Sequence, residues 1–404
     1  MLPLLLALSA PLVQDWTPPP PPPTVPSVAM AQPRFSPFVL PDGLRVVTQV
    51  AELEPLAGVL AELLSARLGR EVVLGAPPAR SGDVVLTLGY TADEVGEGPE
   101  ALSIEVFEDH VALSGRTPDG VARAAARMLQ LLTPTPAEDP AGAPSWALPA
   151  VRLDDAPRFT WRAVRVVGDL ELASTQRLLD LLFLGSFNAL VLEGVSGVGE
   201  GWQARQQARQ LALVKGLAVD AKARGISVVV DRSSQPMPFA RADEGASLRP
   251  LLCRPGDPAN LAPFIEAGRS LVGASRSWRL GLEVADPVAR TSPEGAAYSW
   301  SPLGFLGAAD SDLAKAASPL VIGSELEVRG AEGVQAFARV LPCLSERAWG
   351  AASAPEVLSD FRPRAVALTS LVELFGAAHA ASSDEAHPGG LRRNGPDPRP
   401  GSGR

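Results

Sequence analysis

The sequence predicts an α/β protein in which a small α+β sheet domain precedes an α/β barrel or a doubly wound sheet. Hydrophobic residues make up 46% of the 404 residues, which is enough for a sizeable core. In the first part of the chain a strand and a helix are followed by several strands and a second helix. In the second part strand and helix patterns alternate in pairs, as they do in parallel sheets.

The two ends of the chain are expected to lie outside the folded domains. Residues 2–13 are apolar but too short to span a bilayer, so we interpret residues 1–16 as a secretory signal peptide. A leader that remains attached is the alternative. Residues 17–36 include six consecutive prolines and are expected to form an extended Pro-rich linker. Residues 382–404 are polar and rich in Gly and Pro, which predicts a disordered tail.

These tails favour a secreted or periplasmic protein that has no contact with a membrane once the signal peptide is removed.

Between the tails, residues 37–135 are predicted to form the small α+β domain. A helix pattern over 56–68 stops before Gly69, and a second helix is expected at 119–132. Strands are expected at 44–50, 84–88, 102–107 and 110–114, with a tight hairpin turn at Glu108-Asp109.

A Pro-rich linker at 136–150 leads to the second domain, residues 151–381. Strands are expected there at 163–167, 189–192, 226–231, 278–284 and 320–326, and helices at 174–184, 203–223, 260–272 and 331–344. Parallel strands in such a fold present their carboxyl ends at one working face. The functional residues are therefore expected at that face.

The composition excludes several classes of chemistry. Only 3 His occur, and none lies between residues 111 and 378, which excludes a His-based triad or a His metal cluster in the larger domain. Cys253 and Cys343 lack a CxxC partner and cannot form a zinc site alone, so we expect two buried thiols, with a disulfide as the alternative. A net charge of −9 without a basic cluster disfavours nucleic acid as a partner. We predict neither a metal nor a cofactor.

Five short segments match the motifs of one family in the same order along the chain. Residues 126–132 (ARMLQLL) end the first domain, and residues 153–162 (LDDAPRFTWR) open the second. The segments Phe187-Asn188, 224–229 (RGISVV) and 345–349 (SERAW) follow. Together they resemble glycoside hydrolase family 20, the β-N-acetylhexosaminidases. The resemblance implies a (β/α)8 TIM-type barrel, and the short stretch from Glu283 to Glu327 implies that this barrel is shortened or incomplete.

Members of this family use the 2-acetamido oxygen of the substrate as nucleophile, with an adjacent Asp-Glu pair in which Glu is the acid. The counterpart here is residues 279–284 (RLGLEV), where that pair is not intact. Aligned without gaps, Glu283 takes the place of the Asp, and a shift of one residue makes it the acid. The resemblance therefore gives Glu283 as the candidate catalytic residue and implies that hydrolysis is impaired or lost.

The same resemblance suggests sugar-binding residues. Arg162 matches the family arginine that holds sugar hydroxyls, although a structural ion pair is an equal alternative. Trp202 remains from the acidic-aromatic loop after strand two, and Glu327 from the strand-eight motif. Tyr298 and Trp300 would form an aromatic wall against which sugars stack, or would pack in an irregular closure of the barrel.

Further acids, Glu193, Asp231 and Asp286, are expected near Glu327, either as an acidic mouth or as a solvated rim. Three functions remain open. The first is a secreted protein that recognises N-acetylhexosamine-containing glycans without efficient hydrolysis. The second is an active retaining hexosaminidase that uses Glu283, and the third is a non-catalytic scaffold or interaction protein. The missing Asp-Glu pair favours the first and the third, and the surviving Arg162 favours the first.

Overall fold

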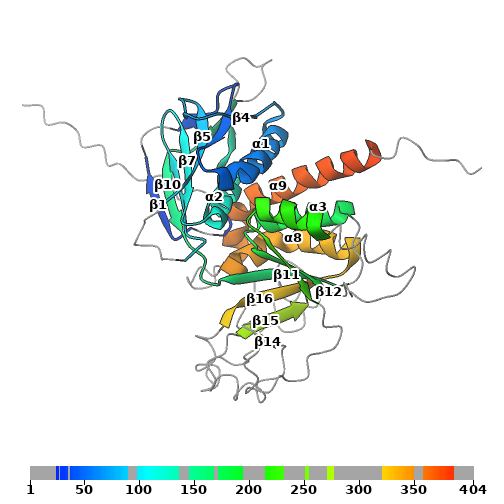
Figure 1. Cartoon of the computed structure of the whole chain (residues 1–404). Helices are drawn as coiled ribbons and strands as arrows, with labels where there is room; N and C mark the ends of the chain where they lie inside the picture. Colours follow the sequence, from blue (N-terminus) through cyan, green and yellow to red (C-terminus); the bar gives the residue numbers. More distant parts are fainter. Residues whose placement is uncertain are drawn as a thin grey trace, which may run out of the picture.

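The computed structural model contains two α/β units joined along a shared core (Figure 1). The structure describes residues 24–26, 28–34, 37–89, 98–135, 145–167, 172–193, 214–231, 251–253, 271–276, 321–349 and 358–385. In these ranges no helix is both long enough and apolar enough to cross a membrane.

The N-terminal unit is built on a seven-stranded sheet. Its strands in spatial order are β1 (Met30–Pro33), β10 (Val151–Asp155), β6 (Leu102–Val106), β7 (Val111–Gly115), β5 (Asp83–Leu88), β3 (Arg45–Thr48) and β4 (Val73–Gly75). The strands from β1 to β7 pair antiparallel, and those from β7 to β4 pair parallel. A small antiparallel sheet, with the order β2 (Phe38–Val39), β9 (Ser145–Leu148) and β8 (Thr133–Thr135), lies beside it.

Two helices cover one face of the seven-stranded sheet, α1 (Glu54–Leu68) and α2 (Pro118–Leu131). The alternation of side chains along the strands explains why, because Leu86, Ile104 and Leu113 are buried beneath the helices. Gly69 ends α1 with φ of 66°, as the sequence predicts. The hairpin predicted at Glu108-Asp109 joins β6 to β7 and is confirmed.

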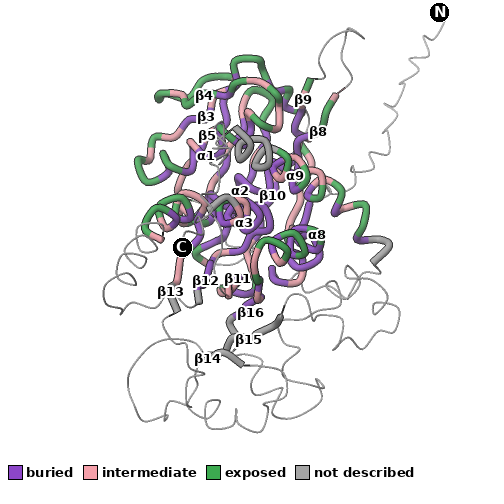
Figure 2. The backbone as a smooth tube through the Cα atoms, turned by 90° about the vertical axis from the view of Figure 1, so that its right-hand side faces the viewer, coloured by how far each residue is buried: buried purple, intermediate pink, exposed green. Residues whose placement is uncertain are grey.

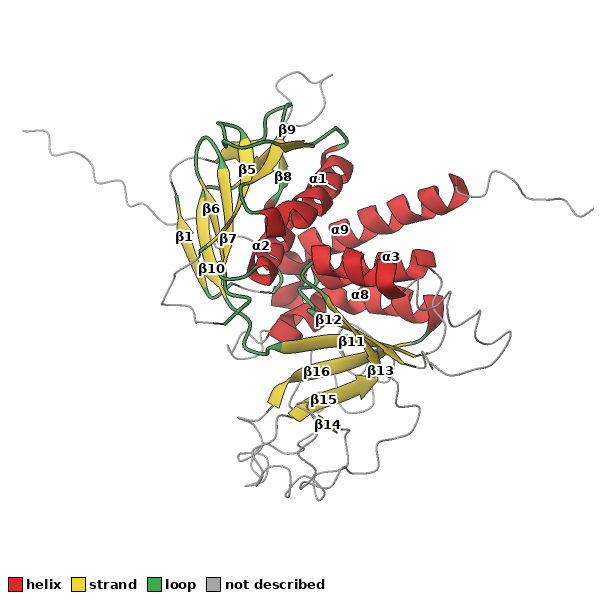
Figure 3. Cartoon of the chain, viewed as in Figure 1, coloured by secondary structure: helices red, strands yellow, loops and turns green. Residues whose placement is uncertain are grey.

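The C-terminal unit is a six-stranded sheet in which all neighbouring strands are parallel. Its order is β13 (Ser227–Asp231), β12 (Ala189–Glu193), β11 (Trp161–Val167), β16 (Val321–Val328), β15 (Leu271–Arg276) and β14 (Leu251–Cys253). Helices α3 (Leu172–Leu184) and α8 (Gly330–Trp349) cover one face, and residues 214–223 are also helical. Figure 3 shows these helices between the sheet and α9 (Leu358–Glu385). The predicted parallel α/β arrangement is confirmed, but a closed barrel is not observed in the described part of the chain.

The main core runs through both units, as the buried segments in Figure 2 show. Helix α9 contacts α1 and α2 of the first unit and α3 and α8 of the second. In the parallel sheet, Val164, Val166 and Leu326 point into this core. Ala163 and Val191 belong to a separate small cluster on the opposite face, which we call the inner face.

The structure differs from the expected domain limits. β1 lies within the segment expected to be a linker, and β10 lies in the first sheet rather than in the second domain. Val25 is fully buried, and its N–H and carbonyl are both bound by the side chain of Gln130, each at 2.8 Å. The antiparallel pairing of β1 with β10 explains this difference, because it joins distant parts of the chain that no local pattern links.

Two further expectations differ at element level. Residues 271 and 272, expected at the end of a helix, belong to strand β15, and residues 382–385, expected in a disordered tail, continue α9. The expected signal peptide, residues 1–16, and the strand expected at 278–284 lie outside the described residues.

Candidate functional site

Charged residues occupy matched positions near the carboxyl ends of four neighbouring parallel strands. Glu193 at the end of β12 is in register with Asp231 at the end of β13. Glu327 in β16 is in register with Arg165 in β11. The backbone therefore brings together three of the four acids expected at this face, and Asp286 lies outside the described residues.

Arg165 and Glu325 form an ion pair on the inner face. Nη2 of Arg165 donates to both carboxylate oxygens of Glu325, at 3.0 and 3.3 Å. The alternation of side chains puts Arg165 on the face opposite Val164 and Val166. The two charged side chains are only 15% and 7% exposed, so each holds the other in place in a largely desolvated position.

Glu327 lies two residues further along β16 and therefore on the same face as Glu325. Its Oε1 accepts a hydrogen bond from Nε of Arg329 at 2.7 Å and forms an ion pair with Nη2 of Arg329 at 2.6 Å. Glu327 is 14% exposed and Arg329 53%, so this pair lies closer to solvent than the first. The two carboxylates can accept hydrogen bonds from a hydroxyl-rich ligand, and the two arginines that hold them in place can donate hydrogen bonds to it.

Arg162 lies at the other end of β11. It is 1% exposed, and its Nη2 lies 2.6 Å from Oε1 of Glu100 in the N-terminal unit. Its Nε also donates to the carbonyl of Ser186 at 2.8 Å, and its guanidinium lies 4.9 Å from the centroid of the Trp349 ring. The structure thus contains the structural ion pair that was one of the two alternatives for Arg162. The structure does not bring Arg162 together with Glu327, because successive side chains along a strand point to opposite faces.

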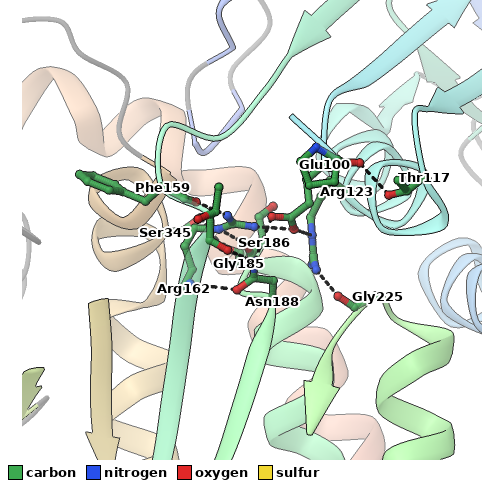
Figure 4. A network of polar contacts seen from close by, with 12 residues as sticks. Glu100, Thr117, Arg123, Phe159, Arg162, Gly185, Ser186, Asn188, Gly225 and Ser345 are labelled. Atoms are coloured by element: carbon green, nitrogen blue, oxygen red, sulfur yellow. Dashed lines mark hydrogen bonds and ion pairs between the residues drawn. The ribbon is translucent and has the colours of Figure 1, made fainter. Parts of the chain in front are cut away.

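Glu100 is the acceptor at the centre of this buried contact between the units (Figure 4). Burial alone would raise the pKa of Glu100, but the charges and hydrogen bonds of Arg162 and Arg123 outweigh burial and hold this pKa below its usual value. The carboxylate is therefore ionised at neutral pH and serves as a structural anion between the units.

Several sequence candidates lie outside the described residues, namely Glu283, Trp202, Tyr298 and Trp300. Among the residues that are described, no group of three or more His, Cys, Asp or Glu side chains is placed to hold a metal ion. Sequence reasoning missed Arg165 and Glu325. The signal for Glu325 was the pair of acids two residues apart in 325–328 (ELEV), which marks one polar face of a strand, whereas the two arginines of 161–167 (WRAVRVV) are three residues apart and lie on opposite faces.

The first part of the chain is similar to a domain of one known family. Residues 21–156 match the family model described as glycosyl hydrolase family 20, domain 2. A comparison with curated proteins finds no significant match.

Three solved structures illustrate the likeness. The β-N-acetylhexosaminidase from Streptomyces coelicolor A3(2) has a TM-score of 0.63 at 15% identity, over 89% of this chain and 98% of that one. An exo β-N-acetylglucosaminidase from Vibrio harveyi, in complex with N-acetylglucosamine, has a TM-score of 0.61 at 12% identity, over 89% of this chain and 79% of that one. The N-acetyl-β-hexosaminidase from Streptomyces plicatus has a TM-score of 0.59 at 17% identity, over 89% and 96%. At such identities the likeness shows the mixed α/β fold.

Proposed function

Because the chain resembles the β-N-acetylhexosaminidases of glycoside hydrolase family 20, in its N-terminal domain and in its fold, we propose that it binds N-acetylhexosamine-containing glycans. The binding site is the carboxyl end of the parallel sheet. The observation that carries this proposal is the pair of inner-face carboxylates, Glu325 and Glu327, with Arg165 and Arg329 beside them. Two similar structures, from Vibrio harveyi and Streptomyces plicatus, are complexes with N-acetylglucosamine, which supports this ligand class.

The chemistry of the site suits a sugar. Carboxylate oxygens accept hydrogen bonds from hydroxyl and amide groups, and a charge-assisted hydrogen bond is stronger than a neutral one. Glu325 is already held by Arg165, so it loses little side-chain freedom when a ligand binds. Tyr298 and Trp300 remain proposed partners for the apolar face of the sugar.

We further propose that hydrolysis is impaired or lost and that the protein is secreted. The first proposal rests on the sequence at 279–284, where Glu283 has no neighbouring acid. The second rests on the apolar stretch at residues 2–13. An active hexosaminidase that uses Glu283 and a non-catalytic scaffold remain the alternatives.

Calorimetric titration with N,N′-diacetylchitobiose tests the binding proposal. We expect saturable binding by the natural protein and a Kd that rises by about tenfold or more in Glu325→Gln or Glu327→Gln, because each removes an anionic acceptor. Glu105→Gln is the matched control, since Glu105 pairs with Arg34 in the other sheet. Absence of binding, or equal binding by all three variants, would overturn the proposal.

Turnover of a chromogenic N-acetyl-β-glucosaminide separates the alternatives. Binding without turnover is the result that we expect. Turnover near that of an ordinary hexosaminidase, abolished by Glu283→Gln, would instead establish the active enzyme. If the protein shows neither binding nor turnover, the non-catalytic scaffold is the function that remains.

A further inference from the structure

The N-terminal unit contacts the amino ends of three consecutive parallel strands through two residues, Glu100 and Arg123 (Figure 4). Arg162 is the second residue of β11, Asn188 directly precedes β12, and Gly225 lies two residues before β13. These three residues come from separate parts of the sequence. Glu100 and Arg123 therefore contact the amino ends of the strands, whereas the candidate site lies at the carboxyl ends.

Glu100 binds the starts of the first two strands. Its Oε1 accepts hydrogen bonds from Arg162 Nη2 at 2.6 Å and from Arg123 Nε at 3.0 Å. Its Oε2 accepts from Asn188 Nδ2 at 3.0 Å. A buried carboxylate without partners would be strongly unfavourable, whereas these three donors make its burial specific to one geometry.

Asn188 joins the starts of three strands. Its side-chain Oδ1 accepts from the N–H of Arg162, and its own N–H donates to the carbonyl of Arg162, both at 2.9 Å. The carbonyl of Asn188 accepts from the N–H of Ser227, the first residue of β13, at 2.9 Å. Asn188 therefore links Glu100 to the starts of β11, β12 and β13 through its side chain and its backbone.

Arg123 provides a separate contact to the third strand. Its Nη2 donates to the carbonyl of Gly225 at 2.5 Å, and its side chain is fully buried. Gly225 has φ of 65° and lies against α2, where an added Cβ would be 2.9 Å from the Cβ of Ala122. The loop before β13 is thus packed on the N-terminal unit as well as hydrogen-bonded to it.

We propose that the N-terminal unit is a base plate that fixes the amino ends of β11, β12 and β13, with Glu100 as the positioning residue. Strands transmit the position of their starts because a shift by one residue moves every side chain to the other face. The base plate thereby sets where Arg165, Glu193 and Asp231 stand at the carboxyl ends. Its effect on glycan binding rests on the proposed function, whereas the fixing of the strands does not.

Amide hydrogen exchange of the full chain tests this proposal without any ligand. In Glu100→Gln we expect exchange to rise at least tenfold at 161–167, 189–193 and 227–231, while 83–88 and 111–115 stay protected. Glu105→Gln, a neighbouring Glu-to-Gln change that breaks the pair with Arg34, should leave all five segments unchanged. An equal rise in both units, or no rise in the three parallel strands, would overturn the base plate.

A second variant covers the case in which Glu100→Gln does not fold. In Asn188→Ser the serine side chain is too short to reach Glu100, but Glu100 stays paired with Arg123 and Arg162. We expect exchange to rise in β11, β12 and β13 only, and unchanged protection there would contradict the proposal. If the natural protein binds no diacetylchitobiose, the exchange result still decides on the base plate. If it does bind, Glu100→Gln should raise the Kd by about threefold or more while Glu105→Gln does not.

Discussion

Gly225 allows a quantitative test of the contact between the two units, because alanine meets two separate penalties there. The φ of 65° costs a residue with a Cβ about 1–2 kcal/mol. The added Cβ would lie 2.9 Å from the Cβ of Ala122 and 3.3 Å from the Cα of Asp119, and overpacking of this kind costs about 1–3 kcal/mol. Gly225→Ala should therefore lower the free energy of unfolding by about 2–5 kcal/mol.

Gly330 provides the matched control, because it has φ of 59° but nothing lies within 4 Å of an added Cβ. Gly330→Ala should show only the backbone penalty of about 1–2 kcal/mol. Urea unfolding followed by far-ultraviolet circular dichroism measures both variants. The difference between them isolates the clash with α2. Equal losses in the two variants would refute the close packing of this loop on the N-terminal unit.

Three further predictions concern buried residues in the N-terminal unit and at its contact with the second unit. Trp349 lies between two arginines, each 4.9 Å from its ring centroid, so Trp349→Ala should cost about 3–5 kcal/mol of unfolding free energy, and Trp146→Ala, at a partly exposed site with one such arginine, less. Burial is the largest influence on Asp155 and raises its pKa from 3.8 to about 6, so stability should fall by up to about 3 kcal/mol as the pH rises from 4 to 7, a dependence that Asp155→Asn removes. Gln130→Ala loses both hydrogen bonds to Val25 and should raise amide exchange there, at a cost of about 1–3 kcal/mol.

For each of these three variants, one result would contradict the prediction. Equal losses in the two tryptophan variants would deny the role of the paired arginines. The folded protein binds the proton of Asp155 more tightly than the unfolded chain does, so raising the pH should lower the free energy of unfolding. A free energy of unfolding that instead rises between pH 4 and 7, and rises more steeply in the natural protein than in Asp155→Asn, would contradict the raised pKa of Asp155. Unchanged protection of Val25 in Gln130→Ala would show that other contacts hold the N-terminal segment.

Local patterns in the sequence were sufficient for several elements but not for their long-range pairing. The helix that stops at Gly69 and the hairpin at Glu108-Asp109 depend on residues close in sequence, and both are confirmed. The placement of β1 beside β10 depends on backbone hydrogen bonds between distant segments. The proline run directed attention to a linker and away from the buried Val25.

Local sequence patterns were also not sufficient to predict the contacts of the charged residues on the parallel sheet. A motif identifies Arg162 as notable, but only the fold shows that its partner is Glu100, 62 residues away, at the amino end of the strand. Arg165, three positions later, points to the opposite face and meets Glu325. Identifying the inner face required knowing which residues the helices cover.

A crystal structure of the protein grown with N,N′-diacetylchitobiose tests the proposed site most directly. The sugar is expected to lie at the carboxyl ends of β11 and β16, with its hydroxyl or acetamido groups hydrogen-bonded to Glu325 or Glu327. A sugar bound on the N-terminal unit, or none at a ligand concentration that saturates binding in solution, would contradict it.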